Sequence, residues 1–251
     1  MEINTLRRKM EIIIGDEHGR GKFCNIYNKL KDDSTIKHFV CVGDYFDPYF
    51  CYKEDAADLL ENYNKIIEAA RKDSRIILLL GNHDIHYIMN CDNSRFDYFN
   101  AGKFEKAFMD NIDLFKLSYK FDNGAVVSHA GITKTWLKTM DLKTVDDING
   151  LLKKFIETQT SNGSISALRY DDSDYSGYGE SCSQGCTWVR PNGLIQDPAF
   201  DYQIVGHTQT EHISHFLFET PSKEPIVVEN ENGKFVFVDT GDNFNYYSME
   251  C

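Results

Sequence analysis

Short polar motifs follow apolar runs at several points along this sequence, and their side chains are of types that bind metals or transfer protons. The first run, residues 10–14, ends at a glycine and is followed by Asp16 and, two residues later, by His18. The apolar side chains need burial, whereas a carboxylate and an imidazole need water, a partner or a metal. Open α/β sheets place their sites at the carboxyl ends of buried strands, so this junction is a candidate site.

The same arrangement recurs at later positions in the chain. Taken alone, each polar residue would be interpreted as a helix cap, a turn residue or a surface group. Parallel strands, however, bring their carboxyl ends to one edge of a sheet, where such groups can converge. The set that could converge is Asp16, His18, Asp44, Asn82, His129 and His207.

This donor set indicates a kind of metal and a kind of reaction. Carboxylates, an amide and imidazoles without a thiolate suit two hard or borderline divalent ions such as Mn²⁺, Fe or Zn²⁺. Two ions about 3.5–4 Å apart can hold the attacking and leaving oxygens of a phosphoryl displacement. A water shared by two dications loses a proton near neutral pH and becomes a nucleophile.

The elements that must position these residues can be predicted from periodicity. Residues 38–47 and 75–84 are further apolar strands with polar tips, and the helical stripe between them predicts a crossover helix over residues 53–72. This βαβ succession predicts a parallel sheet. In the second half, Asn123-Gly124 and Asn232-Gly233 are signals for type I′ hairpins. Another helical stripe runs from residue 145 to 156, so we expect an α/β protein with mixed sheets, one packed on the other.

Length and charge limit the classes of function. A chain of 251 residues is expected to form a single domain, 1–251. Its 27 basic and 39 acidic residues give a net charge of -12, which disfavours stable nucleic-acid binding. The N-terminus lacks an apolar secretion segment, and no apolar run approaches the length of a membrane span. We therefore expect a cytoplasmic protein that does not contact membranes.

Cysteines and one polar segment leave alternatives open. Seven scattered cysteines fit reduced thiols better than a disulfide framework. Cys182 and Cys186 come closest to a pair, but without a second pair they are weak support for a structural zinc site. Residues 161–185 are rich in glycine and serine and lack periodicity, so a mobile lid and a surface insertion are both open interpretations.

The motifs also resemble those of a known family. "GDEHG", "GDYFD", "GNHD", "SHAG" and "GHTQ", in this order, resemble the successive signatures of the calcineurin-like metallophosphoesterases. "TWVRP" and "VDTGD" resemble the branch that contains phosphoprotein phosphatases and bacterial diadenosine-polyphosphate hydrolases. The resemblance runs from Asp16 to Asp242 and implies a four-layer αββα sandwich with a dimetal centre at the strand ends. By motif, it also implies the following roles: Asp16 and His18 for the first metal, Asp44 as the bridge, Asn82, His129 and His207 for the second metal, His83 as general acid and Asp47 as the residue that holds its ring.

Two departures from the family pattern affect substrate and metal binding. Pro48-Tyr49 stands where the phosphoprotein phosphatase pattern has Arg-Gly, so one expected guanidinium for the phosphate is missing. Arg190 is the motif-supported substrate residue, and Arg95 is a candidate replacement for the missing one. Gln209 stands where many phosphodiesterases have a second histidine, so we expect the first metal to be labile.

Several further polar residues are open to a supporting or a surface interpretation. Asp84 is expected to cap a helix or to support the site without binding metal, and His86 is left between a substrate contact and a surface position. No role is assigned to His38, His212 or His215.

The leading functional hypothesis is a dimetal phosphatase acting on phosphomonoesters or small nucleotide phosphoanhydrides through a hydroxide held by the metals. The alternative is a phosphodiesterase acting on cyclic nucleotides or nucleic-acid ends, and a third hypothesis is a non-catalytic scaffold. The expected partners are a small phosphorylated substrate or a phosphoprotein. The expected cofactors are two divalent ions, with Mn²⁺ ahead of Fe or Zn²⁺.

Overall fold

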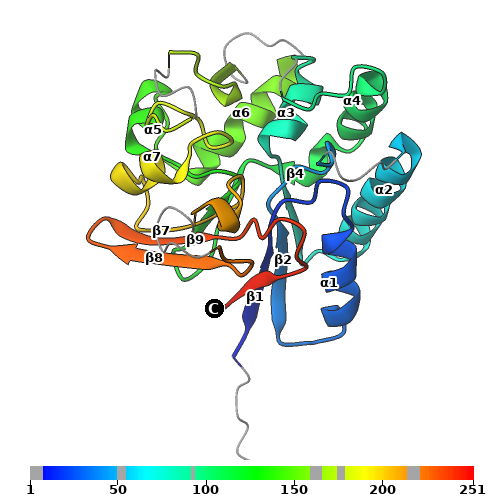
Figure 1. Ribbon diagram of the computed structural model, residues 1–251, viewed down its shortest axis with the longest axis horizontal. Coiled ribbons are helices and arrows are strands. Elements are labelled where there is room, and N and C mark those ends of the chain that lie inside the picture. The colour runs from blue at the N-terminus through cyan, green and yellow to red at the C-terminus, as the bar shows by residue number, and fades with distance from the viewer. Residues whose placement is uncertain (1–7, 50–54, 92–93, 159–165, 174–178, 214–220) are drawn as a thin grey trace, which may run out of the picture.

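The computed structural model describes residues 8–49, 55–91, 94–158, 166–173, 179–213 and 221–251 (Figure 1). Its first sheet has the strand order β10-β1-β2-β3-β4. The strands span Met10–Ile14 for β1, Ile36–Cys41 for β2, Ile76–Leu79 for β3, Phe115–Lys116 for β4 and Tyr246–Glu250 for β10. β1 to β4 are parallel. β10 pairs antiparallel with β1 and places Ser248 opposite Ile12.

The second sheet has the order β5-β6-β7-β9-β8, in which β6, β7 and β9 are parallel and the edge strands β5 and β8 are antiparallel. Its strands span Ser118–Lys120 for β5, Val126–Ser128 for β6, Tyr202–Val205 for β7, Ile226–Asn230 for β8 and Gly233–Phe237 for β9. Both sheets are therefore mixed, as predicted.

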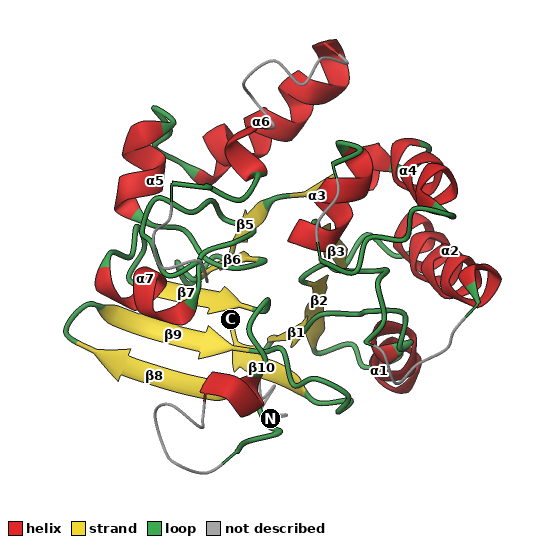
Figure 2. Ribbon diagram, turned by 45° about the horizontal axis from the view of Figure 1, so that its top comes forward, coloured by secondary structure: helices red, strands yellow, loops and turns green. Residues whose placement is uncertain are grey.

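Helices cover the outer faces of the two sheets. The described helices include α1 Lys22–Leu30, α2 Ala56–Lys72, α3 Asn82–Ile88, α4 Ala101–Met109, α5 Lys134–Thr139, α6 Val145–Thr158 and α7 Pro191–Gln196, with 3-10 turns at Ile112–Leu114 and Ser166–Leu168. Figure 2 shows α1 and α2 beside the first sheet, and α5 and α7 beside the second. Among the described residues, no helix has both the length and the apolar character needed to cross a bilayer.

Alternating side chains hold the layers together. Ile13 and Val40 of the first sheet belong to one buried cluster with Val127 and Ile204 of the second sheet. The neighbouring Ile12 packs in a different cluster, which contains residues of the covering helices. Because successive side chains of a strand point to opposite faces, each sheet has one face on its partner and one on helices. This arrangement confirms the predicted αββα sandwich.

The local predictions are met with two corrections. The crossover helix begins at Ala56, after Asp55 caps it by accepting from the Ala57 amide, while residues 53 and 54 lie outside the described part of the chain. Both hairpins form, but the type I′ assignment is wrong. That turn needs a positive φ at both central residues, and only the glycines are left-handed, with φ of 88° at Gly124 and 145° at Gly233.

Residues 161–185 are described only in part, since 161–165 and 174–178 lie outside the described residues. Within the described part, Leu168 is buried and Gln184 accepts a hydrogen bond from the Asp171 amide. The described cysteines, including Cys182 and Cys186, are free thiols.

Candidate metal centre

The predicted ligands follow strands that run in the same direction within each sheet. Asp16 follows β1, Asp44 follows β2, Asn82 follows β3 as the first residue of α3, His129 follows β6 and His207 follows β7. The backbone is left-handed at several of these positions, with φ of 42° at His18, 57° at Asp44 and 64° at His207. Non-glycine residues rarely adopt this conformation, and such strain is concentrated at functional sites.

Glycines let the strand ends approach the carboxylates. A Cβ built on Gly81 would lie 2.1 Å from Asp44 Oδ1, and one on Gly206 would lie 2.2 Å from Asp16 Oδ1. Because neither contact is possible for a real side chain, these positions explain why glycine precedes the polar tip.

Three side chains form the first half of the centre. His18 Nδ1 donates to the Phe46 carbonyl at 3.0 Å, which turns Nε2 toward the carboxylates. His18 Nε2 lies 3.5 Å from Asp44 Oδ2 and 3.9 Å from Asp16 Oδ2. All three side chains are buried and could hold one ion.

The second half of the centre shares Asp44. His129 Nε2 lies 3.6 Å from Asp44 Oδ2 and 2.9 Å from Asn82 Oδ1. His207 Nδ1 lies 3.0 Å from the same Asn82 oxygen. Asp44 Oδ2 therefore lies close to His18 on one side and to His129 on the other, as a bridging carboxylate must.

The donor atoms fit a cation better than they fit one another. His129 Nδ1 donates to the Val42 carbonyl at 2.9 Å, so Nε2 of the neutral ring offers a lone pair. That lone pair faces the Asn82 carbonyl oxygen, and two lone pairs at this distance repel unless a proton or a metal lies between them. Burial lowers the pKa of His129, which disfavours the proton. The geometry therefore fits a metal ion.

Electrostatics lead to the same conclusion. Burial, together with the charges of Asp239 and Asp44, raises the pKa of Asp16 well above its usual range. Burial would also raise the pKa of Asp44, but the surrounding imidazoles outweigh it and hold that pKa well below its usual range. Burial lowers the pKa of His18 and His207. Neutral imidazoles can bind divalent ions directly, and an ion beside Asp16 would supply the positive charge that returns its buried carboxyl to the carboxylate form.

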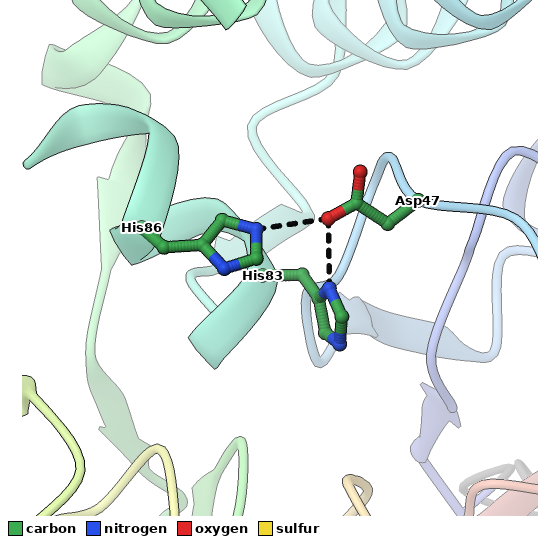
Figure 3. Close-up of side chains that lie close together, drawn as sticks. All are labelled: Asp47, His83 and His86. Atoms are coloured by element: carbon green, nitrogen blue, oxygen red, sulfur yellow. Dashed lines mark hydrogen bonds and ion pairs between the residues drawn. The ribbon is translucent and has the colours of Figure 1, made fainter. Parts of the chain in front are cut away.

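Asp47 accepts hydrogen bonds from three side chains of α3, and Figure 3 shows two of them, His83 and His86. His83 Nδ1 donates to Asp47 Oδ2 at 2.7 Å, and His86 Nε2 donates to the same oxygen at 2.8 Å. The Tyr87 hydroxyl donates to the other oxygen, Oδ1. Burial favours the neutral carboxyl, but the bonds from the two histidines outweigh it and lower the pKa of Asp47. The three side chains could also surround an ion, yet hydrogen bonds already satisfy the carboxylate.

Both candidate substrate arginines line the cleft of the candidate metal site. One cleft of about 420 Å³ is lined by the predicted ligands His18, Asp44, Asn82 and His207 and also by His83, Arg95 and Arg190. Arg95 donates to His83 Nε2 at 2.9 Å and to the Asp47 carbonyl at 3.0 Å. Arg190 donates to the His207 carbonyl at 3.2 Å and to Thr208 Oγ1 at 3.0 Å.

The structure shows the positions of several residues whose roles the sequence left open. Asp84 accepts from the amides of Asp44, Tyr45 and Gly81 at 2.7–2.9 Å, so it supports the metal loops, as expected. The surface interpretation of His86 is wrong, because the side chain is buried on Asp47. His38 pairs with Glu11, whereas His212 lines the cleft. His215 lies outside the described residues.

Two features beside the candidate ligands Asp16 and His18 were not predicted from the sequence. The Tyr49 ring lies 4.9 Å from the His18 ring, with the guanidinium carbons of Arg20 and Arg95 at 4.7 and 4.1 Å from its centroid. The signal in the sequence was that Tyr49 stands where the family pattern has glycine. Behind Asp16, the fully buried Lys22 ammonium lies 3.9 Å from Asp239 Oδ1. No pattern in the sequence marked this lysine.

Fold and site together define a phosphoesterase-type α/β sandwich with a candidate dinuclear metal centre. The chain belongs to the calcineurin-like phosphoesterase family, whose profile matches residues 12–211. This match confirms the resemblance inferred from the motifs. No curated protein sequence matched the chain.

Solved structures show a similar fold. A cold-active protein-tyrosine phosphatase of a psychrophilic Shewanella species is similar with a TM-score of 0.56 and 19% identity, over 94% of this chain and 72% of the other. A protein serine/threonine phosphatase from Saccharomyces cerevisiae has a TM-score of 0.51 and 15% identity, over 94% and 68% of the two chains. At these identities the likeness shows the fold alone.

Proposed function

We propose that the protein is a phosphatase that uses two divalent ions to hydrolyse phosphomonoesters or small nucleotide phosphoanhydrides. The observation that carries this proposal is the position of Asp44 Oδ2, 3.5 Å from His18 Nε2 and 3.6 Å from His129 Nε2. Asp16, His18 and Asp44 would hold one ion. Asp44, Asn82, His129 and His207 would hold the other.

Mn²⁺ is the ion that we propose first, with Fe or Zn²⁺ as alternatives, because the donors are oxygens and imidazoles without thiolate. When bound, such a pair of ions activates water and neutralises phosphate charge. Gln209 lines the same cleft as His18. An amide binds metal more weakly than an imidazole does, so the ion at Asp16 and His18 is proposed to exchange faster.

His83 is proposed to protonate the leaving oxygen. Its Nδ1 is held by Asp47, which fixes the ring and leaves Nε2 on the side of the cleft. In the structure, Arg95 donates to Nε2, so Arg95 must leave this nitrogen before His83 can carry a proton there. A phosphate in the cleft would attract the displaced guanidinium and that of Arg190.

One assay tests both the phosphatase proposal and the phosphodiesterase alternative. Two arginines at the cleft favour a dianionic monoester over a monoanionic diester. The protein is stripped with a chelator, reloaded with Mn²⁺ and given para-nitrophenyl phosphate or bis(para-nitrophenyl) phosphate. We expect activity only after reloading and faster turnover of the monoester. Faster turnover of the diester would favour the phosphodiesterase, and no hydrolysis with both ions bound would favour the scaffold.

A further inference from the structure

A second pocket opens beside the metal cleft and shares two residues with it. This side pocket, of about 260 Å³, is lined by Asn82, His86, Leu168, Arg169, Tyr170 and Trp188, among others. Asn82 and Trp188 also line the metal cleft. A substrate whose phosphate lies on the metals can therefore extend from one space into the other.

Aromatic side chains form one wall of the side pocket. The Tyr170 and Trp188 rings meet edge to face, with centroids 5.3 Å apart at 78°. Trp188 also contacts the ring of the predicted ligand His207, at 5.8 Å and 80°. Leu168, which also lines the side pocket, is fully buried. A wall of this kind, continuous with the metal site, favours a planar ring over a flexible polar chain.

His86 lines the side pocket and has a buried polar atom without a partner among the described residues. Its side chain is 2% exposed, and its Nε2 donates to the Asp47 carboxylate. The neutral ring then has an accepting lone pair on Nδ1, which lies on the side of the ring away from Asp47 (Figure 3). Among the described residues, no group donates to this nitrogen. A buried acceptor without a donor is unfavourable, so the site favours a ligand that supplies one.

Helix α3 connects the side pocket to the chemistry. It carries Asn82, His83 and His86 in little more than one turn. The rings of His83 and His86 lie 4.9 Å apart, and both donate to the same oxygen of Asp47. A leaving group that takes its proton from His83 therefore lies next to the side pocket.

We propose that the side pocket is the leaving-group subsite and binds a planar ring carrying an N–H or O–H donor, with His86 Nδ1 as the acceptor. The inference rests on the proposed phosphatase function. A nucleobase and a hydroxyaryl group both have this chemistry. His86 is thus a specificity residue, and Tyr170 and Trp188 select for the ring.

The experiment compares matched substrates on the metal-loaded enzyme. One pair is para-hydroxyphenyl phosphate and para-methoxyphenyl phosphate, and the other is adenosine monophosphate and its dimethylamino analogue. In each pair only the first ring carries the donor, and glycerol phosphate has no ring. The pair with the larger donor effect shows whether the side pocket fits a hydroxyaryl group or a nucleobase better. We expect the donor to raise kcat/KM at least about fivefold in that pair.

Variants separate this role from a structural one. His86→Phe is expected to remove the donor effect while the enzyme still hydrolyses glycerol phosphate. Any indirect effect on His83 through Asp47 would change all substrates alike and leave the ratio within a pair unchanged. Tyr170→Leu is expected to lower kcat/KM for ring substrates relative to glycerol phosphate. Tyr98→Leu, at a residue that is 69% exposed and outside the lining of the side pocket, is the control and is expected to leave every ratio unchanged.

The outcomes distinguish the two proposals. If no substrate is hydrolysed although both ions are bound, the phosphatase function fails. If glycerol phosphate is hydrolysed but the donor effect is absent, or persists in His86→Phe, the assignment of the side pocket is wrong.

Discussion

Gly81→Ala tests whether the close approach of the third strand to Asp44 holds the metal centre together. The backbone at Gly81 is extended, with φ of -97° and ψ of -179°, so alanine can adopt it without strain. The effect of the substitution must therefore come from the added methyl group. That carbon would lie 2.1 Å from Asp44 Oδ1 and 2.7–2.8 Å from the His129 ring.

The size of the effect follows from the displacement. A carbon and an oxygen come no closer than about 3.3 Å even in favourable C–H···O contacts, so Asp44 or the loop must move by about 1 Å. A displacement of this size in a reacting centre lowers the reaction rate by about 100-fold, and we use the same factor for the binding of an ion that needs equally exact placement of its ligands. We expect at least about a 100-fold loss of Mn²⁺ affinity, equivalent to about 2.7 kcal/mol. Overpacking alone should lower the free energy of unfolding of the metal-free protein by about 1–3 kcal/mol.

Calorimetric titration with Mn²⁺ and urea unfolding without metal measure the two effects separately. Gly102→Ala is the matched control, because a Cβ at this position in α4 meets nothing within 4 Å. It should raise the free energy of unfolding by about 0.5–1 kcal/mol and leave Mn²⁺ affinity unchanged. If Gly81→Ala binds two ions as tightly as the control does, Asp44 does not bridge them.

Four further substitutions test individual roles. Asp44→Asn should abolish activity and reduce the metal content measured by elemental analysis, because a neutral amide cannot offset the repulsion of two dications; full metal content with normal turnover would refute the bridge. His83→Asn should keep both metals but lower kcat roughly 10²–10⁴-fold, and less for leaving groups that need no proton; an equal loss for all leaving groups would make His83 structural. Arg190→Lys should raise KM and lower kcat for monoesters more than for diesters, at constant metal content; unchanged monoester kinetics would remove Arg190 from the substrate site. Asp73→Asn tests the hydrogen bonds from Arg75, which lower the pKa of Asp73 to about 2. The pKa of this carboxyl in the unfolded chain is about 3.9. The stabilisation is therefore present above about pH 3.9 and disappears as the pH falls through about 2. The urea midpoints of the variant and the parent should differ at pH 7 and converge near pH 2.

The parts of the fold that could be predicted are those with a strong period or an abrupt end. A run of apolar residues stopped by glycine and a polar side chain marks both the strand and its carboxyl end. That signal located Asp16, Asp44 and Asn82, and parallel pairing explained why they meet. The hairpins were also found, but not their turn type, because the asparagine is not left-handed and the following glycine is.

Contacts that depend on tertiary packing could not be predicted. The spacing between His83 and His86 does not show whether their side chains face solvent or the interior. Only the position of Asp47 in the fold shows that both rings donate to one oxygen. Similarly, a lysine in an amphipathic helix is usually solvated, yet Lys22 lies at 0% exposure. Its burial depends on Asp239, which lies more than 200 positions away in the chain.

The pairing of β1 with β10 bears on how fast the protein folds and unfolds. It joins residues 12 and 248, and the ligands of the candidate centre lie on loops that follow strands of both sheets. Such distant contacts form slowly, because a long loop must close before they stabilise anything. The metal site is thus complete only after the sheets have docked, late on the folding route. Ions that bind there would slow unfolding while leaving the folding rate nearly unchanged, so metal loading would extend the lifetime of the folded protein.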